Sequence, residues 1–290
     1  SHAFPARMAL ACACAAWRRG AGPTGKARMN KKGILVLGWL LAAAGVASAE
    51  DGRIDRSADV ARYISIMQSG RVGDAAIAAR RIYTSGISDP ALAAAINARL
   101  IAEDRTISGE KEHKDFCVFM VRALASAGNV DYADALKTMR KQTRNSKISS
   151  TIDDELPQLK WYQAKNAVTA SSAGHQAGED PEIAGLVNLL NSDDYSFKHW
   201  GAERMYWDRN FDPRLMETLA PQVRQFVAQA TRIEDAQQDD TMALFVRLLG
   251  YSKNAQYGEL LASVEQAPNA SPGIRKHAHA AQEVLKKTTL

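Results

Sequence analysis

The amino-acid sequence predicts an all-α protein, and three observations support that prediction. Helix-forming residues such as Ala, Leu, Arg, Gln and Glu dominate residues 50–290, while Gly and Pro are sparse within the periodic segments. Apolar residues recur at spacings of three and four positions, which gives each expected helix a single apolar stripe. Two long segments of the chain also resemble each other, so the expected helices fall into two similar halves.

The apolar stripes place the expected helices along the chain. No segment has the pattern of a β-strand. A polar stretch at residues 104–114 divides the first half, and further helices are expected at residues 148–159 and 274–285. The four clearest stripes consist of Val60, Ile64 and Met67; Leu92, Ile96 and Leu100; Ile183, Leu186 and Leu190; and Leu215, Leu219 and Val223.

A thirteen-residue motif occurs twice, as AARRIYTSGISDP at residues 78–90 and as GAERMYWDRNFDP at residues 201–213. The copies share five identities at a constant offset of 123 residues. In each copy one helix is expected to end within the motif and the next helix to begin at the Asp-Pro pair. The Asp side chain accepts hydrogen bonds from free amides at the N-cap, and the fixed φ of Pro suits the first helical position.

A second pair of segments extends the similarity. Residues 120–136 and 245–261 share six identities at an offset of 125 residues, among them Arg122 with Arg247. The first half of the periodic region is therefore colinear with the second. Each half is expected to contain about two helix pairs, which gives about eight helices in all.

Paired helices that are joined by an Asp-Pro corner and repeated in tandem resemble HEAT-like or armadillo-type helical repeats, over roughly residues 58–287. The resemblance implies an α-α superhelix, or α-solenoid, that holds a partner along a groove. The expected helix pairs are longer than the usual HEAT period of about 40 to 47 residues, which leaves a TPR-like or irregular helical array as an alternative.

The basic residues are concentrated near the N-terminus. The 290 residues contain 37 Lys and Arg against 32 Asp and Glu, but seven of the basic residues and none of the acidic ones lie in residues 1–49. Residues 50–290 therefore have 30 basic and 32 acidic residues, a net charge of −2. A balanced chain of this kind has no electrostatic surface suited to phosphate backbones, so nucleic acid is not an expected partner.

A secretory signal peptide is expected at residues 29–49. Two lysines precede an apolar stretch at residues 33–46, and small residues then predict cleavage after Ala49. The apolar stretch is shorter than the roughly 20 residues of a spanning helix, so no stable membrane span is expected after cleavage. Residues 1–28 are interpreted as a disordered upstream extension, with translation starting at Met29. The protein is accordingly expected to be periplasmic or secreted.

The expected domain organisation consists of two helical-repeat halves, residues 50–161 and 182–290, and a linker at residues 162–181. The linker is rich in Ala, Ser and Gly and has no apolar period. Residues 50–290 contain one cysteine, Cys117, so stability is expected to come from packing and not from internal disulfides.

The residue patterns do not favour catalysis or metal binding. His277 and His279 lie two positions apart, about 200° around a helix axis, and therefore cannot share a metal ion. Cys117 lies in an apolar helical run, where a buried, inert thiol is expected. Acidic clusters fall at expected helix ends, where capping and solvation explain them. Phosphate-binding, nucleophile-elbow and zinc motifs are lacking, so no enzymatic activity, cofactor or metal is expected.

The candidate binding residues are Trp200, Arg204 and Trp207. They fall on one side of the second-copy helix, opposite a face that carries Ala202 and Tyr206. Two tryptophans on an outward face, with an arginine between them, have the composition of an interface hot spot. The alternative is that they pack on a neighbouring repeat or under the linker, because aromatic stripes at helical spacing are often packing residues.

These patterns predict a non-catalytic interaction or scaffold module of the bacterial cell envelope that binds a protein or peptide along a solenoid groove. One alternative is a helical-repeat binder or enzyme that acts on a cell-envelope ligand. It requires Trp200, Tyr206, Tyr251 and Tyr257 to converge on one deep cavity. The other alternative is a structural homo-oligomer whose exposed apolar patch pairs with itself.

Overall fold

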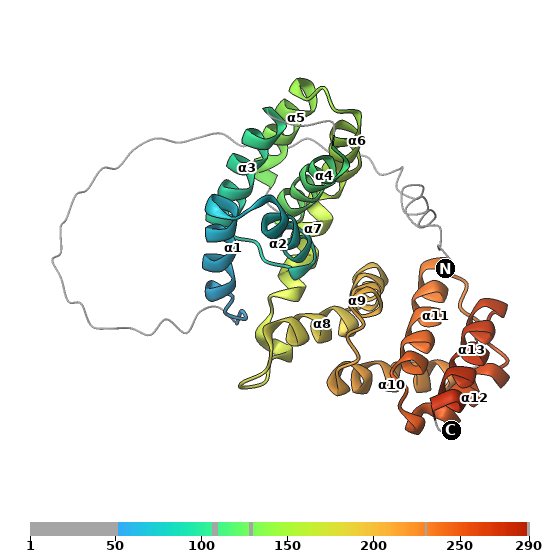
Figure 1. The fold of residues 1–290 in the computed structure, drawn as a ribbon. Helices are drawn as coiled ribbons and strands as arrows, with labels where there is room; N and C mark the ends of the chain where they lie inside the picture. Colours follow the sequence, from blue (N-terminus) through green and yellow to red (C-terminus); the bar gives the residue numbers. More distant parts are fainter. Residues whose placement is uncertain (1–51, 106–109, 128–129, 230, 289–290) are drawn as a thin grey trace, which may run out of the picture. The chain divides into compact units, whose positions relative to one another are not determined.

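The regular elements of the chain are helices. Apart from an isolated β-bridge between Arg53 and Ser171, the described residues contain no β-pairing, so the prediction of an all-α chain is confirmed (Figure 1). The expected N-terminal extension and signal peptide lie outside the part of the chain that the structure describes. The computed structural model describes residues 52–105, 110–127, 130–229 and 231–288.

Six α-helices make up the first half of the described chain (Figure 1). They are α1 (Ser57–Ser69), α2 (Val72–Ser85), α3 (Pro90–Arg105), α4 (Lys111–Ser126), α5 (Ala133–Gln142) and α6 (Ser146–Glu155), with a 3₁₀ turn η1 (Val130–Tyr132) before α5.

Six further α-helices make up the second half. They are α8 (Pro181–Asn191), α9 (Tyr195–Asp208), α10 (Pro213–Ala228), α11 (Ala236–Tyr251), α12 (Gly258–Gln266) and α13 (Pro272–Thr288), with a 3₁₀ turn η4 (Ala255–Tyr257) before α12.

The helices of the second half follow those of the first at nearly constant intervals. Helix α2 begins at residue 72 and α9 at residue 195, 123 residues later, while α4 begins at 111 and α11 at 236, 125 residues later. Helix α6 begins at 146 and α13 at 272, an interval of 126 residues. The packing follows the same order, because α2 contacts α4 and α4 contacts α6, as α9 contacts α11 and α11 contacts α13.

The expected number of about two helix pairs per half is wrong, because each half contains six α-helices. The short helices α5 and α12 are separate elements and do not continue the helices before them. In the second half the break falls at Lys253, whose φ is +56°, and the Asn254 side chain then accepts a hydrogen bond from the Gln256 amide at the start of η4. A left-handed residue ends the helical hydrogen-bond ladder whatever the apolar pattern around it.

The expected linker at residues 162–181 is also wrong in its first part, because residues up to 169 are helical. The segment between the halves contains η2 (Leu156–Gln158), α7 (Leu159–Thr169) and η3 (Ser172–Gly174). The buried face of α7 includes Lys165 and Asn166. These two polar residues interrupt the apolar periodicity by which a helix is predicted from sequence. Asn166 is held by a hydrogen bond from its Nδ2 to the Ser126 carbonyl oxygen, at 2.7 Å.

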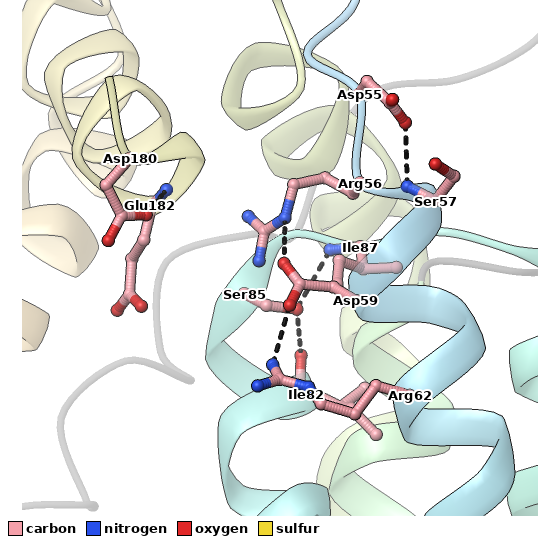
Figure 2. Close-up of polar contacts among 10 residues, drawn as sticks. All are labelled: Asp55, Arg56, Ser57, Asp59, Arg62, Ile82, Ser85, Ile87, Asp180 and Glu182. Carbon is pink, nitrogen blue, oxygen red and sulfur yellow. Dashed lines mark hydrogen bonds and ion pairs between the residues drawn. The ribbon is translucent and has the colours of Figure 1, made fainter. Parts of the chain in front are cut away.

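Local side-chain hydrogen bonds accompany the start of several helices. Asp180 is the N-cap residue of α8, whereas Asp55 lies one residue before Arg56, the N-cap residue of α1. Figure 2 shows Asp55 accepting a hydrogen bond from the Ser57 amide at 2.8 Å, and Asp180, 125 residues later, accepting one from the Glu182 amide at 2.8 Å. The expected Asp-Pro corners are confirmed, because α3 begins at Pro90 and α10 at Pro213. In both corners the preceding Asp side chain accepts a backbone N–H of the first turn, which is an N-cap bond.

The helix before each Asp-Pro corner ends on a left-handed residue. Gly86 has a φ of +73°, and Arg209, 123 residues later, has a φ of +53°. A Cβ at Gly86 would lie only 2.4 Å from the Cγ2 atom of Thr169, so α7 comes close to the backbone at this corner. The left-handed residue is thus a glycine at position 86, where another helix packs closely, and an arginine at position 209, where the side chain is exposed.

Two hydrophobic clusters form the core, one in each half. The first extends from Tyr63 to Tyr162 and the second from Leu186 to Leu285. Trp200 belongs to the sequence of the second half, but its side chain packs against the first cluster. This contact makes α9 the helix that joins the two cores.

Candidate functional site

The first aromatic cluster consists of Tyr83 on α2, Trp161 and Tyr162 on α7, and Trp200 on α9. The ring centroid of Trp200 lies 5.3 Å from that of Tyr83 and 5.4 Å from that of Trp161, and both pairs meet edge to face. Such pairs stabilise a core beyond the area they bury. The expectation that Trp200 faces outward with Trp207 is therefore wrong. It fails because α7, expected to be part of a linker, covers that side of α9.

A buried charged pair lies beside the first aromatic cluster. The Glu155 carboxylate accepts a hydrogen bond from the Tyr162 hydroxyl at 2.7 Å and lies 3.4 Å from Nε of Arg122. Burial raises the pKa of Glu155, and it raises the pKa of Tyr83 to about 12. The Arg122 guanidinium carbon lies 5.9 Å from the Tyr83 ring centroid, so one arginine contacts both the carboxylate and the aromatic cluster.

Lys165 is buried completely in the same place. Its Nζ atom lies 5.1 Å from the Trp200 ring centroid and 5.5 Å from that of Tyr162, and no hydrogen-bond partner is found for it among the described residues. Burial lowers the pKa of Lys165 to about 7, and the positive charge of Arg204 adds to this effect. The aromatic faces around Lys165 attract the amine in its charged form, whereas desolvation favours its neutral form.

The second aromatic cluster consists of Tyr206 and Trp207 on α9 and Tyr251 on α11, together with Arg247. The Arg247 guanidinium carbon lies 4.2 Å from the Tyr206 ring centroid, and its Nη2 donates hydrogen bonds to the hydroxyls of Tyr206 and Tyr251. The Trp207 ring meets Tyr206 edge to face with centroids 5.2 Å apart. Trp207 is 69% exposed, the largest exposure among the large apolar residues of the described chain.

Arg204 is held by carboxylates and does not stack between two tryptophans. Its Nη2 lies 2.6 Å from Asp208 and 3.5 Å from Glu182, and its side chain is 18% exposed. Of the three candidate residues, only Trp207 thus presents most of its side chain to solvent.

The two aromatic clusters contain the same arginine-tyrosine pair. Tyr206 follows Tyr83 by 123 residues and Arg247 follows Arg122 by 125 residues, and in both halves the guanidinium lies near the tyrosine ring. The identities of these residues in the two copies were the sequence signal that could have indicated Arg247. No such signal existed for Tyr251, because the corresponding residue of the first half is Ser126.

Basic residues of α13 lie near Arg247. His277 on α13 is near it, and burial lowers the pKa of His277 while Arg247 and Lys276 lower it further. Within the described ranges no carboxylate lies within ion-pair distance of Arg247. The first cluster thus has an arginine paired with a buried carboxylate, and the second has an arginine that bonds only tyrosine hydroxyls.

The four residues whose convergence would indicate a ligand cavity do not converge. Trp200 lies in the first aromatic cluster, while Tyr206 and Tyr251 lie in the second. Tyr257 lines a separate cavity of about 230 Å³, beside Phe211 and Met216. This volume is below the roughly 300 to 1,000 Å³ of small-molecule sites.

The other titratable residues have structural partners. Cys117 is buried, and burial raises the pKa of its thiol to about 12, which disfavours a reactive thiolate. His113 bonds Glu103 at 2.8 Å. Asp153 pairs with Arg140 at 2.8 Å, and this bond lowers the pKa of Asp153. No group of three or more His, Cys, Asp and Glu with metal-ligand geometry occurs in the described part of the chain.

Comparison with known proteins adds no family. No family model, curated protein or solved structure matches this chain. Among the helices that the structure describes, none combines the length and apolarity required to cross a bilayer.

Proposed function

We propose that the protein is a non-catalytic interaction or scaffold module that binds a protein partner through the second aromatic cluster. The observation that carries this proposal is the exposure of Trp207, at 69%, beside two tyrosines and an arginine. Interface hot spots are enriched in Trp, Tyr and Arg, and a large exposed aromatic side chain gains the most from burial by a partner.

We further propose that the chain arose by duplication and belongs with helical-repeat proteins of the HEAT-like type. The constant intervals between corresponding helices support this, as do the repeated packing order and the repeated Asp caps. In repeat proteins a surface that is buried against the next repeat in one unit is left open in the last unit. The second aromatic cluster has the properties of such an open surface.

The proposed location is the periplasm or the extracellular space. The support is the sequence of residues 29–49, which has the basic, apolar and small-residue regions of a secretory signal. Exported bacterial proteins meet cell-envelope components, so the partner is proposed to be a protein or peptide of that compartment.

The proposal is tested by capture from an envelope extract with the purified protein and two variants. Trp207→Ala is expected to abolish capture of a defined partner without changing the melting temperature, because the side chain is largely exposed. Ile101→Ala is the matched control, because Ile101 is also an exposed apolar residue, at 38%, and lies on α3. If all three proteins capture the same partner, the second aromatic cluster is not its binding surface. If none captures any, the cluster does not bind another envelope protein.

A further inference from the structure

We infer that the partner of the second aromatic cluster is a second copy of this chain, which docks the exposed face of its α2 there. Asp74 and Ile77 of one copy face Arg247, Tyr206 and Trp207 of the other. The inference rests on the proposed function, because it names the partner of the same surface.

The chain contains a template for this contact. Helix α9 packs against the first half through Phe197 and Trp200, whose ring centroids lie 5.5 Å from Trp161 and 5.3 Å from Tyr83. Helix α2 is the counterpart of α9, 123 residues earlier, so Asp74 corresponds to Phe197 and Ile77 to Trp200. We infer that the corresponding face of α2 makes the same kind of contact with another copy.

That face of α2 is exposed in the structure. Ile77 is 58% exposed and belongs to the few large apolar residues of the described chain with such exposure. Asp74 pairs with Arg71 at 3.2 Å, but both side chains are open to solvent. An exposed pair of this kind contributes little and is easily exchanged for another partner.

The acceptor surface is matched by charge as well as by position. In the first half, Arg122 pairs with the Glu155 carboxylate. Ala281 on α13 is the residue that follows Glu155 by 126 positions. It packs so closely on Gly250 that a Cβ added at Gly250 would lie 2.3 Å from the Ala281 Cβ. A side chain larger than alanine therefore does not fit at position 281. Position 281 therefore supplies no carboxylate to Arg247, whereas Asp74 of another copy can.

The apolar part of the contact follows the same pattern. In the template, Trp200 packs edge to face on Tyr83, and Tyr162 contacts both rings, with centroid distances of 6.1 Å to Tyr83 and 6.2 Å to Trp200. In the second half, Tyr251 stands 5.8 Å from Tyr206, so one aromatic neighbour is already present. Ile77 then supplies the group that covers Tyr206 and the exposed face of Trp207.

The contact joins two different surfaces of the chain, so it is heterologous. Each copy has a donor face on α2 and an acceptor face on α9 and α11, and binding at one face leaves the other available. Such contacts generate rings or open chains and not a closed two-fold dimer. The prediction is association beyond a dimer that increases with protein concentration.

The test uses sedimentation velocity on the purified protein and on two variants with opposite faces changed. Ile77→Ser removes the apolar group of the donor face, and Trp207→Ser removes that of the acceptor face; both residues are exposed, at 58% and 69%, so both variants are expected to fold. Each variant alone is expected to associate at least about tenfold more weakly than the wild type. Their equimolar mixture is expected to form one-to-one dimers and nothing larger. In such a dimer the intact α2 face of the Trp207→Ser variant binds the intact acceptor face of the Ile77→Ser variant. The two faces that remain are both changed, so no further copy is added.

Ile101→Ser is the control and is expected to assemble like the wild type. Higher salt is expected to weaken association, because an Asp-Arg contact contributes to it. A wild type that stays monomeric at every concentration overturns the inference, as does a mixture of the two variants that forms no dimer. If the monomer nevertheless captures a different protein through Trp207, the proposed function stands. If it captures none, both fall.

Discussion

The arginine-tyrosine pair of the first half contacts a buried carboxylate and Trp200, whereas the same pair of the second half borders the exposed Trp207. Tyr83 and Arg122 are covered by α7, Trp200 and the Glu155 carboxylate. Tyr206 and Arg247 have Tyr251 and the exposed Trp207 beside them. Both pairs are partly buried, so the corresponding residues differ in what packs beside them, because α7 and Trp200 pack on the first pair.

The difference indicates that the local sequence determines the helices and their corners, while the next element along the chain determines burial. Asp caps and left-handed helix ends occur at corresponding positions in both halves. Burial does not follow these positions. Trp200 and Trp207 lie on one helix, seven residues apart, yet only Trp200 reaches a neighbouring core.

The largest effect is expected from the two tryptophans. Trp200→Ala should lower the free energy of unfolding by about 3 kcal/mol, because it removes an indole packed against three aromatic rings. Trp207→Ala should change it by less than about 0.5 kcal/mol, because that side chain is mostly exposed. Urea unfolding followed by circular dichroism measures both. Equal losses in the two variants would contradict the distinction between a covered and an open cluster.

The next effect concerns the two left-handed corners. Gly86→Ala should destabilise the fold by about 2 to 3 kcal/mol. The alanine would have to adopt a positive φ, and its Cβ would lie 2.4 Å from the Cγ2 atom of Thr169. The double variant Gly86→Ala with Thr169→Ser should recover part of the loss, because Thr169→Ser removes the methyl carbon that the new Cβ meets. No recovery in this variant would mean that the methyl carbon of Thr169 is not what requires glycine at this position.

Sequence reasoning found the elements that depend on neighbouring residues. The Asp-Pro corners at Asp89 and Asp212 were predicted because a cap requires only a side-chain oxygen and the amides of the next turn. Helix α7 was missed because its buried face includes Lys165 and Asn166, which tertiary contacts stabilise and a hydropathy pattern rejects.

The candidate site was predictable only in part. Trp207 was identified from its position on the helix, but the environment of Trp200 depends on α7 and could not be found without that helix. Arg247 and Tyr251 lie about 40 residues from Tyr206 in sequence, at 247 and 251 against 206, and reach it only through the packing of α9 on α11. Long-range packing of this kind leaves no local signal in one sequence.

The buried Lys165 amine gives the first aromatic cluster a pH dependence at neutral and alkaline pH. The pKa of Lys165 in the folded state is about 7, below its ordinary value of 10.5, so the unfolded chain binds the proton more tightly. Stability should therefore rise with pH across this interval, by about 2 kcal/mol between pH 7 and 9 from Lys165 alone. The groups that face it are Tyr162, Trp200 and the cationic Arg204.

The control for this pH dependence is Lys165→Met, which keeps an unbranched side chain of similar size without the charge. This variant should be more stable than the wild type at pH 7, and the difference should shrink by about 2 kcal/mol at pH 9. Denaturant unfolding at both pH values measures the difference. A difference that does not depend on pH would show that the folded protein holds the Lys165 amine at an ordinary pKa.

The smallest effect is expected at the open corner. Arg209 has a φ of +53°, and this left-handed conformation costs a residue with a Cβ about 1 kcal/mol or more. Arg209→Gly should raise the free energy of unfolding by about 0.5 to 1 kcal/mol, because it relieves that strain at an exposed site. Arg224→Gly, at an exposed position inside α10, is the matched control and should lower it by about 1 kcal/mol. Opposite signs at the two positions would show that the backbone at residue 209, and not the loss of an arginine side chain, produces the gain. A loss at both positions would mean that Arg209 contributes contacts at this corner, which would then resemble the covered corner at Gly86 more closely than the geometry indicates.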